Sequence, residues 1–164
     1  MKATIGVYDD HDKAVEAIIK LKDQGYPVKQ LSIIGKGETE VMDNELHVMP
    51  KSSVNIAGVS TGTVLGATLG ILTGVGLFAI PGLGFLYGAG ALVGAIAGFD
   101  FGLIGGGIAS VLTTVGVHED AVKKYHTELE SGKFLVVAQG DDQQVLHASE
   151  VLNAHGTHSD LTMH

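Results

Sequence analysis

Residues 58–74 read GVSTGTVLGATLGILTG and residues 90–106 read GALVGAIAGFDFGLIGG, so that both stretches carry glycine at every fourth position. The recurring residues are Gly58, Gly62, Gly66, Gly70 and Gly74 in the first stretch, and Gly90, Gly94, Gly98, Gly102 and Gly106 in the second. At this spacing the glycines lie along one face of a helix, where the missing side chains let another backbone approach closely. The pattern therefore predicts two glycine-zipper helices.

The segment between the two stretches, AIPGLG at 79–84, predicts a turn. Pro81 has no backbone N–H and disfavours a helical conformation at Ile80, and the glycines that follow are typical turn residues. We therefore expect a helical hairpin with helices near residues 54–77 and 84–114. Each glycine inside a helix costs about 1 kcal/mol relative to alanine, which indicates that the two ladders serve close helix packing.

The region from Ser52 to Val117 contains one charged side chain, Asp100, and 17 of the 24 glycines. Its leucines and isoleucines would expose a larger apolar patch than a soluble monomer tolerates. The hairpin can be buried against hairpins of other copies, in a membrane, or against its own domain. We favour the first, because an aspartate in the middle of a membrane span costs about 2.5–3.5 kcal/mol. In a protein assembly Asp100 is expected to be a hydrogen-bonded buried acid.

The flanking segments have the hydrophobic periods of short strands and amphipathic helices. Strands are predicted at 3–8, 31–34 and 134–138, with a further edge strand at 45–49, and helices at 11–24, at 119–131 and from 142 to the glycine at 156. The order strand, acid pair, helix and glycine occurs twice, at Asp9-Asp10 with Gly25 and at Asp141-Asp142 with Gly156. This duplication predicts an α+β fold of ferredoxin-like type, with helices on a small sheet.

The predicted chain organisation has three parts. Residues 1–53 form the first half of the α/β domain, residues 54–116 form the inserted hairpin, and residues 117–164 form the second half and a tail. The chain length of 164 residues is sufficient for a hydrophobic core.

Composition excludes several functional classes. The net charge is −8, from 18 acidic residues and ten lysines with no arginine, which argues against nucleic-acid binding. The absence of cysteine excludes disulfides and thiolate chemistry. Acids follow the first strand directly, so no secretory signal is expected. We predict a cytoplasmic protein, with the inner face of the cytoplasmic membrane as the alternative location and membrane lipid as the alternative partner.

No residue pattern predicts a catalytic, cofactor-binding or metal site. Both acid pairs open helices, where capping explains them. Of the eight histidines, His155, His158 and His164 fall near the end of the chain, but without the spacing of a metal site, and we expect an exposed polar tail there. Gly35-Lys36-Gly37 follows a predicted strand but lacks the remaining residues of a phosphate-binding loop. We therefore predict a protein that is not an enzyme and uses no cofactor.

Several motifs resemble those of the bacterial general stress protein family, which is also known as low-temperature-induced and has no established function. They are Leu31-Ser32-Ile33-Ile34-Gly35-Lys36, the Ile80-Pro81-Gly82-Leu83-Gly84 turn, Val115 to Ala121, and Phe134 to Ala138. The resemblance extends over nearly the whole chain. It implies a stress-associated, non-enzymatic protein with a small α/β domain and a glycine-zipper insert.

The predicted function is self-assembly into a homo-oligomer or filament through the glycine-zipper hairpin. The sequence is also compatible with two alternative functions. One is a membrane-associated stress protein that the hairpin anchors, and the other is a small ligand-binding or regulatory domain.

Overall fold

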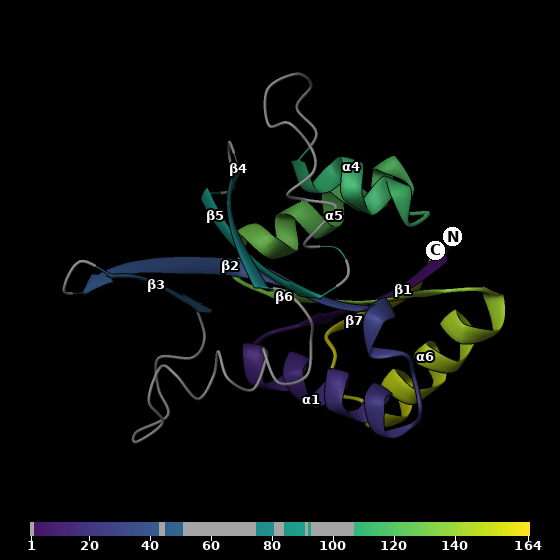
Figure 1. Cartoon of the computed structure of the whole chain (residues 1–164). Helices are drawn as coiled ribbons and strands as arrows, with labels where there is room; N and C mark the ends of the chain where they lie inside the picture. The colour runs from purple at the N-terminus through teal and green to yellow at the C-terminus, as the bar shows by residue number, and fades with distance from the viewer. Residues whose placement is uncertain (1, 43–44, 51–74, 81–83, 91, 93–106) are drawn as a thin grey trace.

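The computed structural model describes residues 2–42, 45–50, 75–80, 84–90, 92 and 107–164, and in these residues a seven-stranded antiparallel sheet carries helices on both faces (Figure 1). The strands are β1 (Lys2–Tyr8), β2 (Leu31–Met42), β3 (Glu45–Pro50), β4 (Val75–Ile80), β5 (Gly84–Gly90), β6 (Phe134–Gly140) and β7 (Asp160–Met163). The helices are α1 (His11–Asp23), the 3-10 helix η1 (Val28–Gln30), α4 (Gly107–Thr114), α5 (Glu119–Glu130) and α6 (Asp142–His155). The predicted α+β class is confirmed.

The strand order is β4-β5-β2-β6-β1-β7, and β3 pairs with the outer half of β2. The first strand lies between the last two, since Ile5 pairs with Val137 of β6 and with Thr162 of β7. The two chain ends consequently lie side by side, on the opposite side of the molecule from β3, β4 and β5 (Figure 1).

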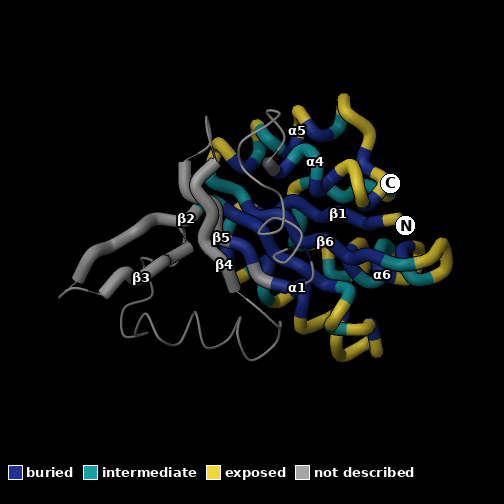
Figure 2. Tube along the Cα trace, turned by 45° about the horizontal axis from the view of Figure 1, so that its top comes forward, coloured by how far each residue is buried: buried dark blue, intermediate teal, exposed yellow. Residues whose placement is uncertain are grey.

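The central strands are buried on both faces, and Figure 2 shows them as the buried centre of the molecule. In β6, Phe134, Val136 and Ala138 pack into a cluster with α1 and α6. Leu135 and Val137 point the opposite way, into a cluster with α4 and α5. Burial on both sides explains why β6 is apolar throughout instead of alternating with polar residues.

The helix ends follow local sequence signals. Asp10 accepts a hydrogen bond from the Lys13 backbone N–H at 2.8 Å and so caps α1. Asp141 caps α6 in a capping box with Gln144, and Gly156 ends that helix in the left-handed conformation. The helices predicted at 11–24 and 119–131 and the strands at 3–8, 45–49 and 134–138 are confirmed to within two residues. The strand predicted at 31–34 continues to Met42.

The predicted helical hairpin is wrong where the structure describes its residues next to the turn. Val75–Ile80 and Gly84–Gly90 are strands β4 and β5, which pair with each other and extend the sheet from β2. Glycine is a poor helix former, and the valine, isoleucine and aromatic residues here favour strands. Residues 107–114 are helical as predicted, and the other residues of the two proposed helices lie outside the described residues apart from Leu92.

The chain end is a strand and not the exposed polar tail that the histidines suggested. β7 pairs with β1, and the backbone of His164 donates to and accepts from the backbone of Ala3, at 2.8 and 3.1 Å. Ser159 donates through its backbone N–H to the Val7 carbonyl at 2.7 Å. The edge of β1 is therefore covered to the end of the chain.

Candidate functional site

Most of the predicted self-association residues lie outside the described residues. These are Gly58, Gly62, Gly66, Gly70, Gly74, Gly94, Gly98, Gly102 and Gly106, together with the predicted buried acid Asp100. Gly90 is described, and it is the last residue of β5. The described part of the candidate site is therefore the junction where the glycine-rich region joins the sheet.

Gly90 is needed at the junction because two backbones meet there. It has a φ of +103°, and a Cβ atom at this position would lie 2.8 Å from the Cα atom of Ser32 and closer still to the Leu31 carbonyl. Any other residue would therefore clash with β2. Gly90 therefore lies close to a strand of the same chain, and this contact differs from the packing between helices that the glycine pattern predicts.

Ser32 fixes the chain that leaves β5. Its side chain is fully buried, and its Oγ accepts a hydrogen bond from the Leu92 backbone N–H at 3.0 Å. Buried hydroxyl groups usually have hydrogen-bond partners, and this N–H donor supplies one for the Ser32 oxygen. This contact ties the residue just before the 93–106 segment to the second strand of the domain.

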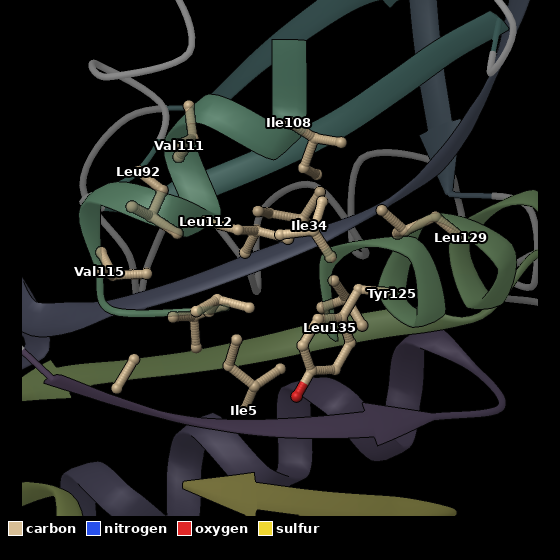
Figure 3. Close-up of a cluster of buried hydrophobic side chains, with 14 of the residues drawn as sticks. Ile5, Ile34, Leu92, Ile108, Val111, Leu112, Val115, Tyr125, Leu129 and Leu135 are labelled. Carbon is tan, nitrogen blue, oxygen red and sulfur yellow. The ribbon is translucent and has the colours of Figure 1, made fainter. Parts of the chain in front are cut away.

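The far end of the same segment returns to the same core. Leu92 and Ile108 are 3% and 2% exposed, and both belong to the cluster that also contains Ile34 and Leu112 (Figure 3). Val111 and Val115 of α4 and its following turn extend this cluster. The segment between Leu92 and Ile108 therefore starts and ends on one face of the sheet.

A cleft of about 600 Å³ lies beside this junction, between α4 and α5. Small and hydroxyl-bearing residues of α4 line one side, and Glu119, Val122 and Lys123 of α5 line the other. The cleft walls include one acid and one lysine and no nucleophile paired with a base.

One aspartate of each acid pair caps a helix, Asp10 for α1 and Asp141 for α6. At Asp10, burial would raise the pKa, but hydrogen bonds from the backbone and side chain of Lys13 outweigh it and hold the pKa below its usual value. The Lys13 Nζ lies 3.0 Å from the Asp10 carboxylate. Asp141 Oδ1 accepts from the backbone N–H groups of Gln143 and Gln144 at 3.0 and 2.9 Å. The carboxylates of Asp10 and Asp141 therefore have a structural role as helix caps.

The histidines near the chain end lie apart in the structure. The Nε2 atom of His164 is 2.6 Å from the Tyr125 hydroxyl, whereas His158 packs edge-on against Tyr8 and His155 faces Glu16 at 3.8 Å. Among the described residues, no group of three or more metal-binding side chains comes together. Gly35-Lys36-Gly37, the other candidate loop, lies inside β2 and forms no phosphate cradle.

Comparison with known proteins finds one family model that matches the first part of the chain. Residues 3–78 match the family model of the heat induced stress protein YflT domain. This confirms the resemblance to the bacterial general stress protein family. Stress association is the part of the predicted function that the match supports. No curated protein and no solved structure matches the chain.

The YflT match covers β1, α1, β2 and β3 and ends inside β4. It leaves out β6, which lies between β1 and β2 in the sheet. The YflT segment of this chain therefore completes its sheet with a strand from the second half of the sequence. At the junction, Ser32 lies in the matched segment, whereas Gly90 and Leu92 come after it in the sequence.

Within the residues that the structure describes, no helix combines the length and the apolar character needed to cross a bilayer.

Proposed function

We propose that this protein is a non-enzymatic, stress-associated structural protein that assembles with copies of itself through its glycine-rich region. The assembly is a homo-oligomer or a filament. The folded body consists of the predicted α/β segments within residues 1–53 and 117–164 together with β4, β5 and α4, and it carries the glycine-rich residues 58–74 and 94–106. The order β7-β1-β6-β2, with α1 and α6 packed into one cluster on the same face, supports a ferredoxin-like arrangement of this body.

The observation that carries the proposal is the anchoring of the 93–106 segment at both ends. Leu92 and Ile108 are buried in one cluster, and the Leu92 backbone donates to the buried Ser32 side chain. Fixing the two ends of a segment reduces the chain entropy that remains to be lost when the segment binds another molecule. Its composition is apolar apart from Asp100, which suits burial against a copy of itself.

The distribution of charge also supports assembly. All but one of the 18 acidic residues, and every lysine, fall outside residues 52–117. An acidic body around an uncharged contact region keeps an assembly soluble while leaving its contact surface free of charge repulsion.

The contact region that we propose is shorter than the one that the glycine pattern predicts. Since residues 75–80 and 84–90 pair within the sheet, close glycine packing between copies is proposed for residues 58–74 and 94–106 only. Asp100 is proposed to be a hydrogen-bonded acid within that contact.

Substitution of the ladder glycines tests this proposal. Gly66→Leu and Gly98→Leu each place a bulky side chain on the proposed contact face, so we expect a smaller particle by light scattering while the circular dichroism of the α/β body is retained. Ala154→Leu adds the same side chain at an exposed position of α6 and should leave the particle size unchanged.

Two results would contradict the proposal. One is an unchanged particle size for both glycine variants. The other is recovery of the wild-type protein in the membrane pellet, with release by detergent only, which would favour the glycine-rich region as a lipid anchor.

A further inference from the structure

Strand β7 forms one edge of the sheet, and within the residues that the structure describes no strand pairs with its outer side. The backbones of His164 and Ala3 exchange two hydrogen bonds, at 2.8 and 3.1 Å, and so form a hydrogen-bonded pair between β7 and β1. Because such pairs alternate along an antiparallel ladder, Thr162 is the next residue of β7 that bonds to β1. The N–H and C=O groups of Leu161 and Met163 therefore point away from β1, toward the outer side.

The outer edge of β7 carries little protection against pairing with another chain. Proteins commonly protect such edges with lysine or proline residues, and β7 contains neither. Its one charged side chain, Asp160, is bound to Lys124 of α5 at 2.7 Å. A strand of four residues offers few hydrogen bonds, so a stable contact at this edge also needs apolar burial.

Two exposed apolar side chains lie on the same side of the molecule as this edge. Met163 is 49% exposed, and it shares a sheet face with Leu161, which packs into the cluster with α1 and α6. Leu146 of α6 is 50% exposed. At about 100° per residue, Leu146 lies about 180° around the helix from His155, which faces Glu16 of α1. Because α6 contacts β7 whereas α1 contacts β2, the flank of α6 that carries Leu146 is the one toward the β7 edge.

We infer that β7 pairs with β7 of a second copy of this chain, antiparallel and about a two-fold axis at Thr162. Leu161 of each copy then forms a hydrogen-bonded pair with Met163 of the other, so the outward-pointing backbone groups of β7 gain partners. The same pairing places one apolar side chain against another. On the opposite face of the strands, Asp160 meets His164 of the second copy instead of a second acid.

The self-complementary pattern of β7 in this register is the reason to expect a second copy. A two-fold contact uses the same patch on both chains, so each feature must find its match within that patch. Along β7, backbone donors meet acceptors, apolar side chains meet apolar side chains, and the acid meets a histidine. The axis also turns the Leu146 flank of α6 toward α6 of the second copy, which adds the apolar burial that a short strand lacks.

This contact is separate from the glycine contact and goes beyond it. β7 and β4 form opposite edges of the sheet, and residues 58–74 directly precede β4 in the sequence. A chain with two separate contact surfaces can bind two neighbours, and this favours an open filament over a closed pair.

Disulfide trapping of the full-length protein tests the register. The chain has no cysteine, and the two Thr162 residues would form a non-hydrogen-bonded pair with Cα atoms about 4.5 Å apart, within the range of about 4.4–6.8 Å for a disulfide. We expect Thr162→Cys to give a covalent dimer under mild oxidation. Ile19→Cys, at a more exposed position on α1, is the matched control and should stay mainly a single chain. A covalent dimer that is no more abundant in Thr162→Cys than in the control would overturn the inference.

Light scattering separates this contact from the glycine contact. When Gly66→Leu and Gly98→Leu together remove the glycine contact, the protein should keep a mass of twice the 17.0 kDa chain. Adding Met163→Lys places a charge in the paired edge, so this dimer should dissociate at least about tenfold more readily. Adding Ile19→Lys places the same charge on α1 and should leave the mass unchanged. Since the Met163 side chain is exposed, circular dichroism should show that Met163→Lys keeps the fold.

The outcomes distinguish the two contacts. A single-chain mass for the double glycine variant, or an unchanged mass after Met163→Lys, would overturn pairing through β7 and leave the glycine contact standing. A particle size that the glycine substitutions do not change would contradict the glycine contact instead, and the yield of the Thr162→Cys dimer would still decide the pairing of β7.

Discussion

At the scale of single residues, two buried tyrosines differ in what their hydroxyl groups contact. The Tyr26 hydroxyl donates to the Gln139 carbonyl at 2.6 Å, whereas the Tyr8 hydroxyl is buried with no hydrogen-bond partner among the described residues. Burial raises the pKa of both side chains, and that of Tyr26 rises to about 12, with a smaller contribution from the negative charge of Asp141. Both tyrosines therefore remain protonated across the physiological range.

Removal of the Tyr26 hydroxyl and removal of the Tyr8 hydroxyl should affect the stability of the protein differently. Tyr26→Phe leaves the Gln139 carbonyl without its donor, and we expect the free energy of unfolding to fall by about 1 kcal/mol. Tyr8→Phe removes a group with no partner, so we expect no loss of stability. Urea denaturation of the two variants measures both values, and an equal loss in both would contradict the hydrogen bonding described here.

Gly90 illustrates what a glycine pattern can and cannot predict at this scale. The four-residue spacing predicts that Gly90 packs in a helix against another helix, whereas Gly90 ends strand β5 beside β2. The spacing does not distinguish the two arrangements, because a positive φ next to Ser32 of β2 and a contact between two helices require the same residue.

At the scale of elements, the stability of β7 depends on the protonation state of His164. The ring of His164 lies against Tyr125, and Asp160 of the same strand pairs with Lys124 of α5 at 2.7 Å. Burial lowers the pKa of His164, and the positive charges of His118 and Lys124 lower it further against the opposing charge of Asp160. The folded state therefore favours neutral His164.

The lowered pKa of His164 predicts that acidification destabilises β7. In the unfolded chain a histidine takes up its proton near pH 6.5, so below that pH the unfolded state binds more protons than the folded state does. The contribution of His164 to stability is therefore complete above about pH 6.5 and decreases as the pH falls toward the lowered folded pKa.

Hydrogen exchange of the β7 amides at pH 7 and pH 5 measures this loss after correction for intrinsic rates. His164→Gln removes the titrating group, and we expect this variant to show a smaller difference in protection between the two pH values. An identical pH dependence in wild type and variant would show that another group is responsible. Burial also lowers the pKa of His11, against the raising effect of Asp12 and Asp10, so some pH dependence of global stability should remain.

Elements with strong local signals could be predicted from the sequence, and elements defined by distant partners could not. Helices α1 and α6 have an apolar stripe, an aspartate cap and a glycine stop, all within one segment. Strands β4 and β5 contain residues that favour strands but no cap or stop of this kind. β5 pairs with the distant strand β2, for example through Ala89 and Ile33, and β4 pairs with β5. β7 is only four residues long, too short for its pattern to be recognised.

At the scale of the whole molecule, the two halves of the chain are interleaved in one sheet. β1 lies between β6 and β7, and β6 separates β1 from β2. The YflT segment at 3–78 therefore shares its core with the second half of the chain. Closing the body with the last strands also places the termini together, away from β4 and β5 (Figure 1).

The molar mass of the wild-type protein in detergent-free solution tests the central claim most directly. Light scattering coupled to size exclusion gives this mass independently of particle shape. Self-assembly through the glycine-rich region predicts a mass that is a multiple of the 17.0 kDa chain and that decreases in Gly66→Leu and Gly98→Leu. A wild-type mass of 17.0 kDa at every concentration would contradict the account.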